Sequence, residues 1–143
     1  MRVIAGKFKG RKLRPPRNLD ARPTTDMARE GLFNVLRERF PIENGAVLDL
    51  FFGSGAVALE FVSRGAGEVT AVDIRLTSKK FLETIAREWE IDNLKVVKAD
   101  VFKLIARAKG RFDIVFADPP YDLDRLGDLP DLALASQWLE QGG

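Results

Sequence analysis

The residues with the clearest chemical potential are Asp118-Pro119-Pro120-Tyr121, which directly follow the apolar run 112–117. Asp118 can accept hydrogen bonds, the prolines have no backbone N–H to donate, and Tyr121 can stack on a flat partner. Together they predict a clamp for a neutral amine on a heteroaromatic base. No carboxylate can deprotonate such an amine at neutral pH, so the clamp must act by positioning it. The alternative is a plain turn after a strand, with Tyr121 packed locally.

A glycine-rich turn, Gly53-Ser54-Gly55, follows Asp49 and lets the backbone approach a ligand closely. The same segment satisfies the dinucleotide-binding pattern, and Asp73 lies about far enough on to hold a ribose, so a nicotinamide-dependent oxidoreductase stays open. A carboxylate at the entrance of the turn would repel a pyrophosphate. It suits the sulfonium and ammonium groups of S-adenosylmethionine, which is therefore the favoured cofactor.

Four carboxylates stand at or just after the ends of four apolar runs: Asp49, Asp73, Asp100 and Asp118. Because ligands bind at the carboxyl ends of parallel strands, we expect these acids to meet at one edge of a sheet. Asp73 would accept hydrogen bonds from ribose hydroxyls and Asp100 from the adenine amine. The residues expected to bind the cofactor are Asp49, Phe51, Gly53, Ser54, Gly55, Asp73, Ile74, Asp100 and Val101.

The elements that must position these residues follow from hydrophobic periodicity. Short apolar runs at 46–51, 68–72, 94–99 and 112–117 predict strands, and the patterns at 56–64, 76–90, 101–108 and 129–140 predict helices. An earlier amphipathic helix follows Thr25 and Asp26 and stops before Pro41. This alternation predicts an α/β fold with a doubly wound, mainly parallel sheet and right-handed crossovers. The acidic segment 122–131 reads as a mobile loop over the site.

Composition limits the chemistry. The 143 residues suffice for one domain with a real core, and they include neither cysteine nor histidine. Disulfides, thiolate metal sites and histidine bases are therefore excluded, and we expect no metal. No apolar stretch approaches the roughly 20 residues of a membrane span, and no signal peptide is recognisable, so a cytoplasmic protein is expected.

Charge is concentrated at the start of the chain. Residues 1–22 hold eight cations and one acid, a net charge of +7, whereas the whole chain carries +2, which leaves −5 for the remainder. Such an arm fits a phosphate backbone, although a solvated leader would look the same. Its alternating residues and the breaks at Gly6 and Gly10 predict a small β-hairpin. We therefore divide the chain into a basic arm, residues 1–22, and a cofactor-binding domain, residues 23–143.

The Asp-Pro-Pro-Tyr and Gly-Ser-Gly motifs, the segment Arg22-Pro23-Thr24-Thr25-Asp26 and the opening residues 2–11 resemble those of the bacterial 16S ribosomal RNA guanine-N2 methyltransferases. The resemblance implies a Rossmann-like class I methyltransferase fold, S-adenosylmethionine as donor, and a guanine N2 amine in the small ribosomal subunit or an assembly intermediate as acceptor. It implies catalytic roles for Asp118, Pro119, Pro120 and Tyr121. It implies RNA contacts by Arg2, Lys7, Lys9, Arg11, Lys12, Arg22, Thr24 and Thr25.

Alternatives remain within and outside this family. Asp-Pro-Pro-Tyr is shared with enzymes that methylate adenine N6 or cytosine N4 in DNA or RNA, so the motif alone identifies amine methylation and not the substrate. A non-catalytic RNA-binding module would keep the basic arm without using the pocket.

The chain departs from the family pattern in two places. Phe52 stands where a small residue is usual, so either the turn is crowded or the ring faces the core. The chain ends at Gly143, where three more strands usually follow, so we expect a truncated form with the fourth strand as an exposed edge. The full-length protein is expected to be a monomer.

Overall fold

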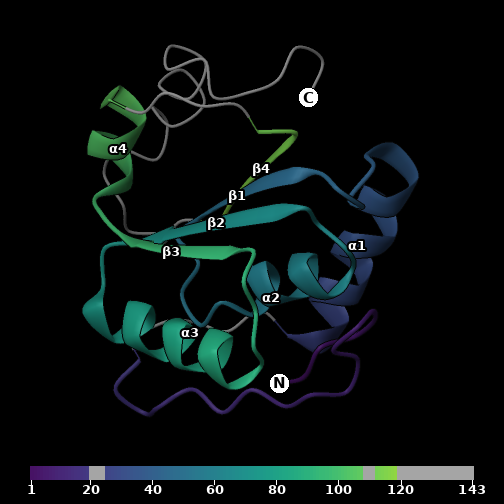
Figure 1. The fold of residues 1–143 in the computed structure, drawn as a ribbon, viewed down its shortest axis with the longest axis horizontal. Coiled ribbons are helices and arrows are strands. Elements are labelled where there is room, and N and C mark those ends of the chain that lie inside the picture. Colours follow the sequence, from purple (N-terminus) through teal and green to yellow (C-terminus); the bar gives the residue numbers. More distant parts are fainter. Residues whose placement is uncertain (20–24, 108–111, 119–143) are drawn as a thin grey trace.

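The computed structural model describes residues 1–19, 25–107 and 112–118, and it forms a parallel sheet with helices on both faces (Figure 1). The predicted helix at 129–140 and the predicted loop at 122–131 lie outside the described residues. The elements in chain order are α1 (Asp26–Arg39), β1 (Ala46–Leu50), α2 (Ala56–Ser63), β2 (Glu68–Asp73), α3 (Leu76–Glu88), β3 (Leu94–Lys98), α4 (Val101–Arg107) and β4 (Ile114–Ala117).

Helix α1 begins and ends where the sequence predicts. The Thr25 side chain accepts a hydrogen bond from the Ala28 backbone N–H at 3.1 Å and so caps the helix. Phe40 leaves the helical conformation immediately before Pro41, which disfavours helix at the residue that precedes it.

The four strands lie in the order β3-β2-β1-β4, and every pairing is parallel. The four predicted strands are therefore confirmed, with bounds that differ by one or two residues. The fourth begins at Ile114 instead of Phe112. Asp113, just before β4, makes two hydrogen bonds to the first residue of β1. Its carboxylate accepts from the Ala46 N–H and its backbone N–H donates to the Ala46 carbonyl, both at 2.8 Å.

Two apolar clusters cover the two faces of the sheet. The larger packs α1, α2, α3 and the N-terminal segment against one face, and the smaller packs α4 against the other (Figure 1). Helix α2 is buried along its whole length. This two-sided burial is what a parallel sheet requires, because βαβ crossovers place helices on its faces.

The basic arm folds back on itself and packs against α2. Arg2 and Lys12 form an antiparallel bridge, which agrees with the predicted hairpin. Val3, Phe8 and Leu13 are buried in the larger cluster. Gly6 lies so close to α2 that a Cβ atom there would fall 2.0 Å from the Ser63 carbonyl oxygen. The division of the chain at residue 22 stays a prediction.

Candidate functional site

The sheet reverses its strand order at β1. From β1 the chain moves outward through β2 and β3 and then returns to add β4 on the other side of β1. Asp49 is the fourth residue of β1, Asp73 ends β2, and Asp118 directly follows β4. In open α/β sheets such a switch point is where ligands bind, so three of the four predicted carboxylates come from the expected place.

Asp49 is the most deeply buried of these acids. Its side chain is 1% exposed, and its Oδ2 atom has no hydrogen-bond partner among the described residues. Burial, followed by the nearby charges of Asp73 and Asp118, raises the pKa of Asp49 well above 3.8, and a hydrogen bond from the Ala58 N–H only partly offsets this. A buried carboxylate oxygen without a partner favours a cationic or N–H-bearing ligand at this position.

Asp73 is fully occupied by protein groups. Its Oδ2 accepts from the Gly53 N–H at 2.9 Å and from Arg75 Nη2 at 3.1 Å. Its Oδ1 accepts from the Arg75 N–H at 3.0 Å and from Arg75 Nε at 3.1 Å. Asp73 thus ties the glycine turn to the end of β2. Ribose hydroxyls can reach this carboxylate only by sharing it with Arg75 or displacing the guanidinium.

Asp100 caps a helix. Its Oδ1 accepts from the Phe102 N–H at 2.9 Å and the Lys103 N–H at 3.3 Å, at the start of α4. Val101 is buried in the cluster beneath that helix. The predicted contact between Asp100 and an adenine amine stays a prediction, and it would use the Oδ2 atom.

The glycine turn is tightly packed. Gly55 has φ +85°, a conformation that favours glycine, and a Cβ atom there would lie 2.6 Å from Leu82 Cδ1, so any larger residue would also have to displace the Leu82 side chain. Phe51 also has a positive φ of 62°, a strained value for an aromatic residue, and its ring packs edge-on against Phe102. Phe52 is buried in the core. Of the two expectations for Phe52, the one in which the ring faces the core is therefore confirmed.

Two apolar side chains stay exposed beside the turn. Ile74 is 58% exposed and Leu76 is 47% exposed, where β2 passes into α3. Exposed Ile74 leaves the predicted cofactor contact sterically possible, and Leu76 offers a second apolar surface that sequence reasoning did not single out.

Asp118 is exposed at the end of β4 and influences the pKa of Asp49. Its predicted partners in the amine clamp, Pro119, Pro120 and Tyr121, lie outside the described residues.

The predicted RNA-binding cations of the arm are exposed: Arg2, Lys7, Lys9, Arg11 and Lys12. Arg11 places its guanidinium 4.9 Å from the ring centre of Phe8 and 5.3 Å from that of Trp89, so part of its surface is used in packing. Thr25 serves as the cap of α1, while Arg22 and Thr24 lie outside the described residues.

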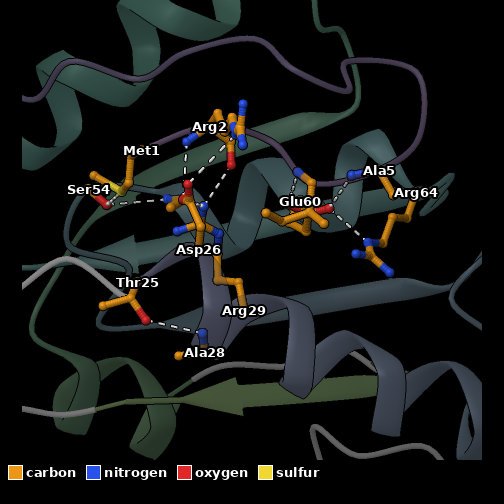
Figure 2. Close-up of polar contacts among 12 residues, drawn as sticks. Met1, Arg2, Ala5, Thr25, Asp26, Ala28, Arg29, Ser54, Glu60 and Arg64 are labelled. Atoms are coloured by element: carbon orange, nitrogen blue, oxygen red, sulfur yellow. Dashed lines mark hydrogen bonds and ion pairs between the residues drawn. The ribbon is translucent and has the colours of Figure 1, made fainter.

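Sequence reasoning missed the groups that fasten the arm. Glu60 in α2 is 0% exposed and accepts from the Ile4 N–H at 2.9 Å, the Ala5 N–H at 3.1 Å and Arg64 Nε at 2.8 Å (Figure 2). Ser63 adds hydrogen bonds to Phe8 and Ala5. The available signal was an acidic residue within an otherwise apolar helix.

Within residues 1–19, 25–107 and 112–118, no group of three acidic, histidine or cysteine side chains is arranged to hold a metal ion. No helix in the same part of the chain is long and apolar enough to cross a bilayer.

Two relatives in the comparison with known proteins carry the same name. Ribosomal RNA small subunit methyltransferase D of Escherichia coli K12 is 36% identical over 140 residues, which cover 97% of this chain and 69% of that protein. The protein of the same name from Buchnera aphidicola subsp. Baizongia pistaciae is 32% identical over 140 residues, with coverage of 98% and 71%.

A solved structure called a "putative methyltransferase" from Escherichia coli has a TM-score of 0.87 and 32% identity, and covers 98% of this chain and 75% of that one. Together with the parallel sheet, this likeness confirms the predicted Rossmann-like class I methyltransferase fold. A family model matches residues 1–143, the whole chain. The protein therefore belongs to the family described as conserved hypothetical protein 95.

Proposed function

We propose that this chain transfers a methyl group from S-adenosylmethionine to the exocyclic N2 amine of a guanine in 16S ribosomal RNA. The observation that carries the proposal is the buried Asp49 at the switch point of the sheet. Its Oδ2 atom has no hydrogen-bond partner among the described residues, and the charges of Asp73 and Asp118 help to raise its pKa. The names of the relatives support methyl transfer to small-subunit ribosomal RNA. Guanine N2 rests on the resemblance of the motifs, as does the assembly state of the substrate.

The residues present fit S-adenosylmethionine. The unpartnered oxygen of Asp49 can accept from an ammonium group, and exposed Ile74 and Leu76 can cover a flat adenine ring. Asp73 can hold the ribose once Arg75 shares or leaves its carboxylate. When bound, the cofactor supplies a methyl group on a positively charged sulfur, which makes the methyl carbon reactive toward a weak nucleophile.

The contribution of the chain to the reaction is orientation. Asp118 accepts one amine hydrogen and the Pro119 carbonyl accepts the other, which leaves the nitrogen lone pair directed at the methyl group. Tyr121 stacks on the guanine ring. No strong base is needed, because the amine reacts in its neutral form and the positively charged nitrogen that results is acidic enough to release its surplus proton to Asp118 or to water.

The direct test is transfer of a labelled methyl group from S-adenosylmethionine to small ribosomal subunits or their assembly intermediates. Asp118→Ala is expected to lower the rate roughly a hundredfold or more, because the amine is no longer oriented, while cofactor binding persists. Asp113→Ala is the matched control, since Asp113 lies on the same segment and contacts only the backbone of β1 among its described contacts. Absence of transfer by the wild-type chain to subunits, intermediates and naked RNA would contradict the proposal.

The site of methylation would be identified by digesting the labelled RNA and separating its nucleosides. Label in N2-methylguanosine is the expected result. Label in an adenine or cytosine nucleoside would assign the chain to another class of amine methyltransferase.

Because the proposed substrate is bacterial ribosomal RNA, the proposal also includes a cytoplasmic location for the protein.

A further inference from the structure

Arg29 in α1 is a buried arginine that the proposed chemistry does not use. Its side chain is 1% exposed, and its Nη2 atom donates to the Arg2 carbonyl oxygen at 2.7 Å and to Asp26 Oδ1 at 2.5 Å. A guanidinium is rarely buried unless it is paired, because losing its hydration is costly. These contacts are therefore a specific attachment between α1 and the start of the arm.

The attachment uses both backbone polar groups of Arg2. Its carbonyl accepts from Arg29, and its N–H donates to Asp26 Oδ1 at 3.3 Å. Partial burial raises the pKa of Asp26, but the Arg2 N–H, the charge of Arg29 and the chain's α-ammonium group more than offset it, so the pKa lies below 3.8. Figure 2 shows Asp26 and Arg29 facing the Arg2 backbone. The Arg2 side chain adds only a long, exposed ion pair, with its Nε atom 4.0 Å from Asp26 Oδ2 and 65% of the side chain exposed, so the backbone contacts contribute most to the position of the arm.

Fixing Arg2 also fixes the residue before it. The Met1 carbonyl accepts from the Leu13 N–H at 2.8 Å. The Met1 sulfur accepts from the Ser54 hydroxyl at 3.8 Å, and Figure 2 shows these two side chains next to each other. Ser54 Oγ in turn accepts from the Ala56 N–H at 3.4 Å, at the start of α2. The first residue of the arm thus contacts the middle residue of the Gly-Ser-Gly turn.

We propose that Arg29 is a positioning residue for cofactor binding, which acts by holding Met1 against Ser54 so that the arm forms one wall of the S-adenosylmethionine site. This inference rests on the proposed function. It assigns the effect to the backbone of the arm and to Met1, whereas the exposed cations of the arm serve RNA. Removing cations that do not contact Asp26, such as Lys9 and Lys12, should therefore leave cofactor affinity unchanged.

The test is the dissociation constant of S-adenosylmethionine, measured by titration calorimetry on the full chain. Arg29→Met keeps the length and apolar stem of the side chain but removes its hydrogen bonds to Arg2 and Asp26, and it is expected to weaken cofactor binding about tenfold, because the wall beside Ser54 is no longer held in place. Arg64→Met is the matched control. It also removes a guanidinium paired with a carboxylate beside the arm, but it lies near Glu60 and away from Met1, so affinity should change less than about twofold.

Loss of a buried arginine can prevent folding, so a second variant carries the same test. Asp26→Ala removes the shared acceptor of Arg2 and Arg29 at a side chain that is 39% exposed, while Thr25 still caps α1. It is expected to weaken cofactor binding about threefold. In the wild type, cofactor should also slow amide hydrogen exchange in residues 1–13, and Asp26→Ala should reduce that protection. A purely structural Arg29 would change exchange without changing affinity.

The outcomes separate the two proposals. Failure of the wild-type chain to bind S-adenosylmethionine would overturn the proposed function and this inference together. Binding by the wild type, with an unchanged dissociation constant in whichever of the two variants folds, would overturn only the role of Arg29.

Discussion

Asp49 is held in an environment that opposes its own charge. Burial and the neighbouring acids favour its protonated form, and its folded pKa lies well above the value of 3.8 expected for an unfolded chain. The free energy of unfolding of the ligand-free protein therefore falls as the pH rises from about 3.8 through the folded pKa of Asp49, and this group lowers it no further at higher pH. A positively charged cofactor reverses the preference, because it stabilises the carboxylate.

Asp49→Asn separates these two effects. Without the buried charge, the ligand-free protein at pH 8 should be more stable by about 1 kcal/mol, and the difference should shrink as the pH is lowered to 5, because the raised pKa of Asp49 favours its neutral form as the pH falls. S-adenosylmethionine affinity should fall about tenfold at pH 8. Denaturant unfolding and calorimetry at both pH values measure the two quantities. A variant that loses stability and keeps full affinity would show that Asp49 serves only the fold.

At this scale the sequence predicts which acids stand at the strand ends but not which of their oxygens are available. Asp73 and Asp100 are already hydrogen-bonded to Arg75 and to the first turn of α4. Such contacts depend on the exact path of a turn, which a pattern of residue types does not specify.

The arm and α2 behave as one structural element. Glu60 and Ser63 hold the arm through its backbone groups, and the side chains of the arm's cations are exposed. Since α2 begins at the glycine turn, the same helix connects the arm to the candidate cofactor site.

Glu60→Gln should loosen this attachment. The amide cannot supply two charged acceptor oxygens, so the free energy of unfolding should fall by about 2 kcal/mol, and amide exchange should rise in residues 1–13. Glu88→Gln, at an exposed position on α3, is the control and should change neither quantity. If residues 1–13 exchange their amide hydrogens at the same rate in Glu60→Gln and Glu88→Gln, the attachment of the arm does not depend on the charge of Glu60.

The sequence predicts the elements well because each repeats a local pattern. The strand at 46–51, for example, differs from β1 by a single residue. The attachment of the arm escapes prediction because it joins residues about 55 positions apart, such as Ile4 and Glu60. Nothing in the local periodicity of either segment indicates the other.

The described residues place exposed cations on the arm and a group of acids at the switch point of the sheet. In the proposed function, the exposed cations of the arm would contact phosphates, and the acids at the switch point would bind a cationic cofactor. One small domain can therefore attract two ligands of opposite charge to different regions.

Lys9→Ala and Arg11→Ala should both weaken binding to small-subunit RNA, and each should reduce the slope of log affinity against log salt by about 1. Only Arg11→Ala should also lower Tm, by about 2 °C, because Arg11 packs on Phe8 and Trp89. Filter binding at several salt concentrations and thermal unfolding measure these effects. Lys95→Ala, an exposed cation of β3, is the control. If Lys9→Ala and Arg11→Ala bind RNA as tightly as the wild type and Lys95→Ala do, the arm is not part of the RNA-binding surface.

The sequence by itself determined the chemistry that is available and the order of the elements, because residue type and hydrophobic period are local properties. It excluded histidine and cysteine chemistry, placed acids at strand ends, and separated charge along the chain. Only the tertiary structure decided that one oxygen of Asp49 has no hydrogen-bond partner within the described part of the chain, that the Arg75 guanidinium pairs with Asp73, and that Met1 contacts Ser54. Those contacts join distant segments, and their geometry exists only after the sheet, helices and arm have packed together.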